Sequence, residues 1–352
     1  MKILHTSDLH LNSKMNSKLG REKAAERKRE LILNFRNMTN FAKSSGCRAF
    51  IIAGDLFDTE KISISVKKSV LDIISSSDGI SFFYLPGNHE KDAITKEELP
   101  KNLFVFEEDW TYFELDKVAF AGRRGTAPDM FSELKKPKEC EKLIAVLHGE
   151  VCDKSDFGAK IGLREVKATD IDYLALGHYH SYSANEFDSG RFAVYSGTPM
   201  GRGFDEVGEC GYVIIDTEAN VNFSFQKSAG RQLLNIDIDI SGLSSTHELC
   251  DKILHACRDI PSCDLVRATL IGGRSPEVKF DLEYAAKRLS DAFYYFEIKD
   301  NSRLSVSAED YVSDKSLKGE FIRLVLLDEN LSEKQKDDII SMGISALMGE
   351  SI

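Results

Sequence analysis

The sequence predicts an α/β protein in which two packed β-sheets carry helices on their outer faces. Strand-length apolar runs alternate with helical patterns over residues 1–90, and shorter strand patterns dominate from Leu103 to Ala121. Such a mixture is typical of sheets that are layered face to face and covered by helices. The chain has 352 residues, more than a single core usually holds, so a second and smaller unit is expected.

Two helices are predicted near the amino terminus. Residues 21–45 form a long amphipathic pattern in which Leu31, Phe35 and Met38 recur along one face. A shorter helical pattern spans residues 63–77. The long helix should cover one face of a sheet with its apolar stripe.

Five of the predicted strands end in side chains that can bind a metal ion. The apolar runs occupy residues 3–7, 49–53, 80–85, 143–147 and 173–176. The donor side chains in the loops that follow are Asp8, His10, Asp55, Asn88, His148, His178 and His180. Loops at the carboxyl ends of strands converge on one crevice in open α/β sheets. We therefore expect these side chains to surround a single point.

This set of donors suits two divalent metal ions. It contains imidazole, carboxylate and amide groups but no thiolate, which favours manganese, iron or zinc. Two ions about 3.5–4 Å apart need a bridging ligand, and a carboxylate can bridge them. Asp55, at the end of a central strand, is the candidate. Two Mn²⁺ ions are expected, with Fe²⁺ or Zn²⁺ as the alternatives.

A single histidine after a strand is more often a hydrogen-bonded structural residue than a metal ligand. His5 is interpreted in this way. Six of the eight histidines, however, lie in these loops or beside them. Structural histidines would not gather in this manner, so the whole pattern indicates a metal centre.

The order of these residues along the chain resembles a known series of motifs. The segments are Asp8-x-His10, Gly54-Asp55-x-x-Asp58, Gly87-Asn88-His89-Glu90, His148-Gly149 and Gly177-His178-x-His180. The series is similar to the motif set of the calcineurin-like metallophosphoesterases. Residues 5–11 and the long second motif resemble the DNA repair exonuclease branch typified by SbcD. Residues 195–204, with Glu206 and Gly208, resemble its YhaO-like subgroup.

The resemblance implies a fold, a metal assignment and a reaction. The implied fold is a four-layered αββα sandwich, two mixed β-sheets flanked by helices, over residues 1–228. One metal is assigned to Asp8, His10, Asp55 and His180, and the other to Asp55, Asn88, His148 and His178. His89 acts on the leaving group, and an imidazole suits a general acid near neutral pH. The implied reaction is in-line attack on a phosphodiester by a metal-activated hydroxide.

Two acidic residues of the motifs are candidates for supporting roles. Asp58 either orients a metal ligand or closes a turn. Glu90 either orients His89 or caps a following helix.

Several basic residues are candidates for phosphate contacts. Arg123 and Arg124 end the strand of residues 118–125 and would either clamp a phosphate or lie in solvent. Arg202 lies in the glycine-rich loop over residues 197–204 and could approach the scissile phosphate. A basic segment near the first motif adds Lys14, Lys18, Arg21, Lys23, Arg27, Lys28 and Arg29. The alternative for this segment is a solvated helix face paired with Glu22, Glu26 and Glu30.

The rest of the chain is predicted to form two further segments. Residues 229–312 alternate strand and helix as a small α+β unit, and residues 313–352 form two helices, for which Ser332 is a candidate N-cap. The resemblance implies that the first segment caps the active site and helps to select DNA ends. It also implies that the helices dock on a coiled-coil, SMC-like ATPase of the SbcC type. The alternative is that they pack on the chain's own cap.

Charge and composition set limits on partners and compartment. The formal net charge of −11 disfavours nucleic acid, although bound metal ions would add positive charge and the basic segment lies beside the first motif. No apolar run reaches the roughly 18 residues of a membrane span. Seven cysteines without a Cys-x-x-Cys pair indicate reduced thiols, so a cytoplasmic location without membrane contact is expected.

The leading hypothesis is a metal-dependent DNA repair exonuclease, with endonuclease activity also possible, that acts on DNA ends beside an SMC-like ATPase. A homodimer is expected from the resemblance alone. One alternative is a phosphatase or a small-molecule or cyclic-nucleotide phosphodiesterase. The other is a DNA-end-binding scaffold with vestigial catalysis, which the complete ligand set disfavours.

Overall fold

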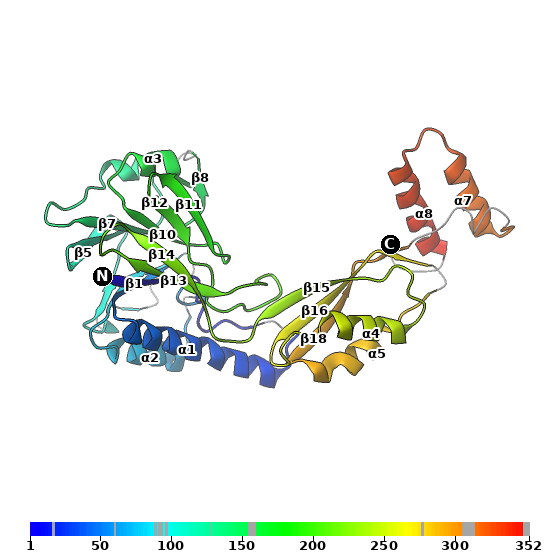
Figure 1. The fold of residues 1–352 in the computed structure, drawn as a ribbon, viewed down its shortest axis with the longest axis horizontal. Helices are drawn as coiled ribbons and strands as arrows, with labels where there is room; N and C mark the ends of the chain where they lie inside the picture. Colours follow the sequence, from blue (N-terminus) through cyan, green and yellow to red (C-terminus); the bar gives the residue numbers. More distant parts are fainter. Residues whose placement is uncertain are drawn as a thin grey trace. The chain divides into compact units, whose positions relative to one another are not determined.

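The computed structural model divides the chain into two compact units, Met1–Gln232 and Leu233–Ile352 (Figure 1). It describes residues 1–352 except 16–17, 60, 88–89, 91–93, 96–97, 128, 154–159, 276–277, 305–313 and 348–352. The division falls close to the boundary predicted after residue 228. The predicted roles of the segments as nuclease, cap and partner-docking helices stay predictions.

The first sheet is mixed, with a parallel centre. Its strands, in spatial order, are β14 (Asn222–Lys227), β13 (Gly211–Asp216), β1 (Lys2–Thr6), β2 (Cys47–Ala53), β3 (Ser81–Leu85) and β4 (Leu103–Val105). Strands β1 to β4 are parallel, whereas β13 runs antiparallel to β1 and to β14. The carboxyl ends of β1, β2 and β3 therefore meet at one edge.

The second sheet is also mixed, with a parallel centre. Its strands, in spatial order, are β11 (Ser183–Asp188), β12 (Arg191–Tyr195), β10 (Tyr173–Gly177), β7 (Lys142–His148), β6 (Val118–Gly122) and β5 (Thr111–Leu115). The four inner strands are parallel and the two edge strands are antiparallel to their neighbours. This sheet presents the ends of β7 and β10.

The two sheets pack face to face through a core of fully buried side chains. Ile51 and Phe83 from the first sheet meet Phe120 and Val146 from the second, and the rings of Phe83 and Phe120 stack with centroids 4.0 Å apart. Alternate strand residues face the opposite direction and bury against helices. Both sheets thus have two apolar faces, which requires helices on the outside.

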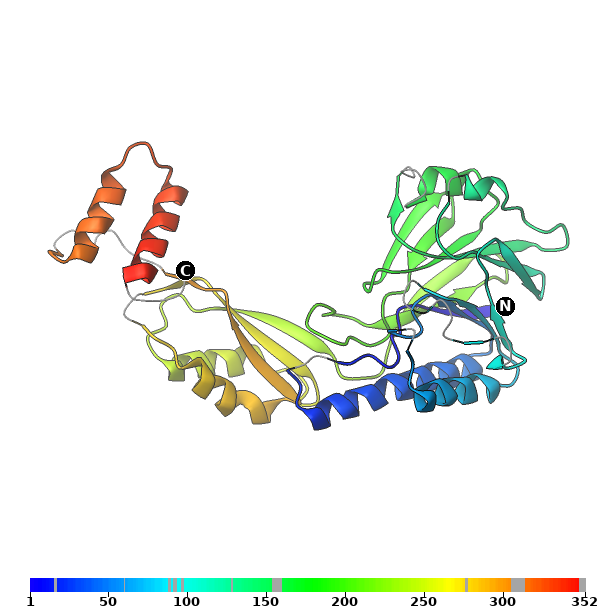
Figure 2. The ribbon, with the colours of Figure 1, turned by 180° about the vertical axis from the view of Figure 1, so that it is seen from behind.

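Helices cover the outer faces of both sheets. On the first sheet α1 (Arg21–Ser44) and α2 (Ile64–Ser75) lie side by side, and α1 buries Leu31, Phe35 and Met38 (Figure 2). On the second, α3 (Leu163–Lys167) and the 3₁₀ helix η2 (Met130–Ser132) form a thinner layer. The predicted four-layered αββα sandwich is confirmed. The short strands β8 (Val151–Cys152) and β9 (Ile161–Gly162) pair outside the sheets.

The second unit contains a three-stranded sheet covered by two helices. The chain order is β15 (Leu233–Asp239), α4 (Thr246–Ala256), β16 (Leu265–Ile271), α5 (Leu282–Leu289), η3 (Ser290–Ala292) and β18 (Tyr295–Asp300). An α+β unit was predicted, but the three strands are all parallel, so the unit consists of consecutive βαβ crossovers. Two short strands, β17 (Gly273–Arg274) and β19 (Arg303–Leu304), also pair.

The two helices near the carboxyl terminus are α7 (Leu317–Leu327) and α8 (Glu333–Leu347). They pack on each other through Ile322, Val325, Ile340 and Ile344. Ser332 Oγ accepts a hydrogen bond from the Gln335 N–H, as predicted for an N-cap. All seven cysteines are free thiols. None of the helices, over the described residues, is both long and apolar enough to span a membrane.

Candidate metal centre

Four of the predicted ligands have left-handed backbone conformations. The φ angles are 52° at Asp8, 47° at His10, 49° at Asp55 and 110° at His178. Residues other than glycine rarely adopt positive φ, and each such residue costs of the order of 1–3 kcal/mol. Backbone strain of this kind gathers at functional sites, where the surrounding structure holds it in place. The loops after β1, β2 and β10 are therefore bent so that short side chains reach one point.

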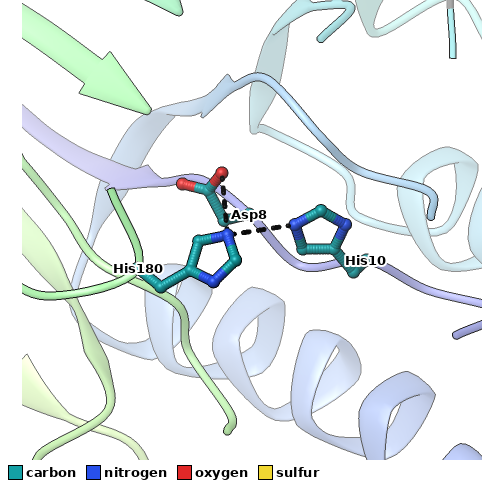
Figure 3. A group of neighbouring side chains, drawn as sticks. All are labelled: Asp8, His10 and His180. Atoms are coloured by element: carbon teal, nitrogen blue, oxygen red, sulfur yellow. Dashed lines mark hydrogen bonds and ion pairs between the residues drawn. The ribbon is translucent and has the colours of Figure 1, made fainter. Parts of the chain in front are cut away.

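A first group of donors consists of Asp8, His10 and His180 (Figure 3). One donor atom from each residue lies within 4.8 Å of the others. The Nε2 atoms of the two imidazoles are 3.4 Å apart, and His180 Nε2 is 3.8 Å from Asp8 Oδ1. Two imidazole nitrogens and a carboxylate oxygen that converge in this way form a suitable site for a divalent cation.

A second group consists of Asp8, Asp55 and His148, again within 4.8 Å of one another. Asp55 Oδ2 is 3.5 Å from His148 Nε2 and 3.7 Å from His10 Nε2. Asp55 thus belongs to the second group and also lies close to His10 of the first. Its role as a bridge stays a prediction. Asp8 belongs to both groups, although the resemblance assigned it to one metal only.

His178 is positioned differently from the other histidines. Its backbone N–H faces both carboxylate oxygens of Asp8, at 3.1 and 3.2 Å, and so holds that carboxylate in place. Its ring centroid lies 5.6 Å from that of His148. Among the described residues its imidazole belongs to neither group. The predicted ligand Asn88 and the predicted acid His89 lie outside the described residues.

Glycines allow the ligand loops to pack closely together. Gly54 has φ +95°, and a Cβ there would collide with His148 Nδ1. A Cβ at Gly87 would collide with Asp55 Oδ1. The glycine that precedes Asp55 is therefore required both by its backbone conformation and by the space that His148 occupies.

His148 is oriented by the backbone of β2. Its Nδ1 lies 3.0 Å from the Ala53 carbonyl oxygen, which directs Nε2 toward Asp55. Burial by itself would lower the pKa of His148, but the Asp55 and Asp8 carboxylates outweigh it and raise this pKa to about 9. The site therefore favours a positive charge, and its donors fit a divalent cation.

His10 and His180 are oriented by carboxylates. Asp58 Oδ1 is 3.2 Å from His10 Nδ1, and Glu206 Oε1 is 2.7 Å from His180 Nδ1. The hydrogen bond that His180 donates to Glu206 raises the pKa of His180. Burial would raise the pKa of Glu206, yet His180 and Arg202 lower it to about 2. Of the two alternatives for Asp58, this contact supports the orienting role.

Arg202 contacts the same two carboxylates. Its Nη1 donates to Asp58 Oδ1 at 2.8 Å, its Nε to Glu206 Oε1 at 3.1 Å, and its backbone N–H to Glu206 Oε2 at 2.7 Å. The sequence suggested an approach to the scissile phosphate. In the structure the guanidinium is instead directed at the carboxylates behind the histidines.

Glu90 is fully buried and binds the loop after β2. Its carboxylate accepts hydrogen bonds from the backbone N–H groups of Leu56, at 2.7 Å, Phe57 and Gly87. Burial raises its pKa to about 8, although the Phe57 and Leu56 N–H groups oppose that rise. The two expected roles, orienting His89 or capping a following helix, concern residues 88–89 and 91–97, most of which lie outside the described residues, and stay predictions. Glu90 ties the third motif to the turn that carries Asp55.

Arg123 and Arg124 lie beside acidic side chains. Arg123 Nη1 is 3.6 Å from Asp109 Oδ1, and Arg124 Nε is 3.5 Å from Glu108 Oε1. These pairs weaken the case for a phosphate clamp.

Arg27 is fully buried and donates to the Gly201 carbonyl oxygen, so the predicted exposed phosphate contact is wrong there. Glu26 and Glu30 bind Arg231, each at 2.8 Å, and Glu30 also binds Arg27. The Arg27–Glu30 pair lies along the helix itself, as in the predicted alternative, whereas the bonds of Glu26 and Glu30 to Arg231 reach beyond the helix.

No separate role was predicted for Glu206, which appeared only within the subgroup signature. The sequence contains a pattern that could have indicated a contact between Glu206 and Arg202, because Glu206 follows Arg202 by four residues in a glycine-rich loop. His5 is structural as expected. Its Nδ1 lies 3.1 Å from Tyr173 Oη between the sheets, and burial lowers its pKa to about 3.

Comparison with known proteins identifies relatives of this chain. The family model described as calcineurin-like phosphoesterase matches residues 1–182. The DNA double-strand break repair protein Mre11 of Methanopyrus kandleri is 27% identical over 241 residues, which cover 59% of this chain and 50% of the relative. The SbcD component of the nuclease SbcCD of Staphylococcus epidermidis is 24% identical over 265 residues, which cover 62% of this chain and 67% of the relative. The match to the Mre11 protein thus spans half of that relative's length.

Two solved structures share a more distant likeness. An archaeal phosphodiesterase is 15% identical, with a TM-score of 0.37, and the match covers 64% of this chain and all of that one. A purple acid phosphatase from yellow lupin seeds is 11% identical, with a TM-score of 0.41, and the match covers 64% of this chain and 51% of that one.

Proposed function

We propose that this chain, which belongs to the calcineurin-like phosphoesterase family, is a metal-dependent nuclease that hydrolyses phosphodiester bonds in DNA. The observation that carries the proposal is the pair of donor groups at the ends of β1, β2, β7 and β10, with Asp8 in both and Asp55 between them. Two adjacent divalent ions are a common arrangement in enzymes that hydrolyse phosphate esters.

The proposed ligands divide between two ions. Asp8, His10 and His180 would hold one, Asn88, His148 and His178 the other, and Asp55 both. When bound, the ions supply Lewis acidity and neutralise charge on the phosphate. Mn²⁺ is the proposed metal, because the donors are imidazole, carboxylate and amide groups.

The chain's own groups prepare this site. The Asp58 carboxylate lies 3.2 Å from His10 Nδ1. Glu206 accepts the Nδ1 proton of His180, so this ring presents Nε2 as a lone-pair donor. The Ala53 carbonyl does the same for His148. His89 is proposed to protonate the departing oxygen.

DNA ends and an SMC-like ATPase are the proposed partners. The support comes from the names of the two relatives, a double-strand break repair protein and a component of a nuclease. Helix α7 adds a physical reason, since Leu317, Leu324 and Leu327 are 74%, 62% and 76% exposed. Apolar side chains spaced along one helix face suit docking on another helix. A homodimer is also proposed.

The test compares the wild type with Asp55→Asn and His89→Ala, each with Mn²⁺. The substrates are end-labelled duplex and single-stranded DNA and a chromogenic bis-phosphodiester. Cleavage of DNA by the wild type, with a loss of at least about 100-fold in both variants, is the expected result.

Two outcomes would replace the proposal. Cleavage of the small ester but not of DNA, even with a purified ATPase partner, would make the chain a small-molecule phosphodiesterase or phosphatase. DNA binding without hydrolysis of any substrate would make it an end-binding scaffold.

A further inference from the structure

We propose that Arg202 is a positioning residue that sets the geometry of the donor group formed by Asp8, His10 and His180. The proposal rests on the metal site of the proposed function. Arg202 donates to Asp58 and to Glu206, and each of these carboxylates holds the Nδ1 side of one histidine. A single guanidinium therefore connects both rings of the group.

All three nitrogens of the Arg202 guanidinium face carboxylates. Nη1 contacts Asp58, whereas Nε and Nη2 both contact Glu206. A planar guanidinium has its donors in fixed directions, so it also fixes the distance between two acceptors bound on different edges. Nε, Nη1 and Nη2 thus each direct an N–H at a carboxylate and not toward a substrate position. The contacts thus favour a positioning role over a substrate contact.

The negative charges of Asp58 and Glu206 also require a cation such as Arg202 beside them. Glu206 is almost fully buried, with 3% of its side chain exposed, and Asp58 is 26% exposed. Asp8 and Asp55 lie on the other side of the same histidines. Without the guanidinium, Asp58 and Glu206 would share a partly buried space as unbalanced anions. Their repulsion would separate them, and this movement would release a ring.

The loop that carries Arg202 is anchored by buried contacts with helix α1. Arg27 Nη2 donates to the Gly201 carbonyl at 2.7 Å, and Asn34 Nδ2 donates to the Pro199 carbonyl at 2.9 Å. Thr198 Oγ1 donates to the Asp8 carbonyl at 2.9 Å, which connects the loop to the first motif. Arg202 is therefore presented from a fixed position.

The effect should be restricted to one of the two metal sites. His148, in the group with Asp8 and Asp55, is oriented by the Ala53 carbonyl and not by a carboxylate linked to Arg202. Loss of Arg202 should accordingly weaken one step of metal binding and spare the other.

The test is calorimetric titration of the metal-stripped full-length chain with Mn²⁺. The variants are Arg202→Ala, Arg202→Lys and Arg202→Gln. A matched control is Arg267→Ala, which removes another partly buried arginine paired with a glutamate, Glu297, in the second unit. Thermal unfolding shows that each variant is folded, and the lysine and glutamine variants keep the test valid where the alanine variant fails to fold.

The expected result is that Arg202→Ala and Arg202→Gln weaken one Mn²⁺ binding step by about 10–100-fold and change the other by less than about 2-fold. Arg202→Lys should recover only part of the loss, because a single ammonium cannot contact both carboxylates in the same way. Arg267→Ala should leave both steps unchanged.

Unchanged Mn²⁺ affinity in the Arg202 variants, with a raised KM for DNA and a smaller salt dependence, would overturn the proposal and make Arg202 a phosphate contact. Equal weakening of both steps would also overturn it, because the effect would then be a general one. Failure of the proposed function is a separate result, since the wild type itself would bind no Mn²⁺ or cleave no DNA.

Discussion

The two donor groups are built by different means, although they share Asp8. In the group with His10 and His180, side chains orient the rings, since Asp58, Glu206 and Arg202 form the support. In the group with Asp55 and His148, the backbone supplies the support through the Ala53 carbonyl and the close approach of Gly54. A substitution can weaken one supporting side chain and leave the others in place. A change in the supporting backbone displaces the ligand loop itself. The first group should therefore tolerate substitution better than the second.

The largest effect is expected from Gly54→Ala. The new Cβ would meet His148 Nδ1 on a backbone with φ +95°, so the variant should lose more than about 3 kcal/mol of unfolding free energy, or one complete Mn²⁺ binding step. Urea unfolding and Mn²⁺ titration measure both quantities. Gly46→Ala is the matched control, because φ there is +74° but no atom lies within 4 Å. Equal losses in both variants would show that backbone strain, and not the contact with His148, is responsible.

The next effect concerns the pH dependence of the metal-free protein. The pKa of His148 is about 9 in the folded chain, above the ordinary value of 6.5. Protonated His148 therefore stabilises the folded chain fully below about pH 6.5, and this stabilisation is lost as pH rises through 9. The expected loss is of the order of 3 kcal/mol. Urea unfolding from pH 6 to 9.5 measures it, and His148→Gln should remove it. His180→Gln should remove a smaller part of the pH-dependent unfolding free energy, because the His180 side chain is 32% exposed. The same pH dependence in the wild type and His148→Gln would refute the idea.

A smaller effect is expected from Glu206→Gln. The amide keeps the size of the side chain but cannot hold the His180 Nδ1 proton or balance Arg202 as a carboxylate does, so one Mn²⁺ binding step should weaken about 10–100-fold. Glu209→Gln in the same loop is the control, since Glu209 is 70% exposed and pairs only loosely with Lys227. Weakening in the control of the same size would place the effect in the charge of the loop as a whole.

The smallest effect is expected from Asn34→Ala in helix α1. The variant loses a buried hydrogen bond to the Pro199 carbonyl, which should cost about 1 kcal/mol of unfolding free energy. Mn²⁺ binding at the group of Asp8, His10 and His180 should weaken by less than about 3-fold, since Arg27 still anchors the loop that carries Arg202. Asn37→Ala, at an exposed position of the same helix, is the control. Loss of a binding step in Asn34→Ala would show that α1 has a direct part in setting the site.

Much of this arrangement could be predicted from the sequence, because the signals are local. The apolar stripe of residues 21–45 became α1, which begins at Arg21 and ends at Ser44. The second predicted helix, over residues 63–77, became α2, Ile64–Ser75. The donors Asp8, His10, Asp55, His148 and His180 lie close together because parallel strands bring their carboxyl ends to one edge. The predicted roles of Asn88 and His89 stay predictions.

The donors that gather in the two groups, and the strand that precedes each of them, were predicted from the amino-acid order alone. The directions of the supporting side chains were settled only when the chain packed. Glu90 turns to the N–H groups of Leu56 and Phe57, and Arg202 reaches Asp58, 144 residues away in the chain. The direction of a side chain in a loop depends on the neighbours that packing brings to it, and no local spacing encodes those neighbours. A strand, in contrast, is read from the alternation of its own residues.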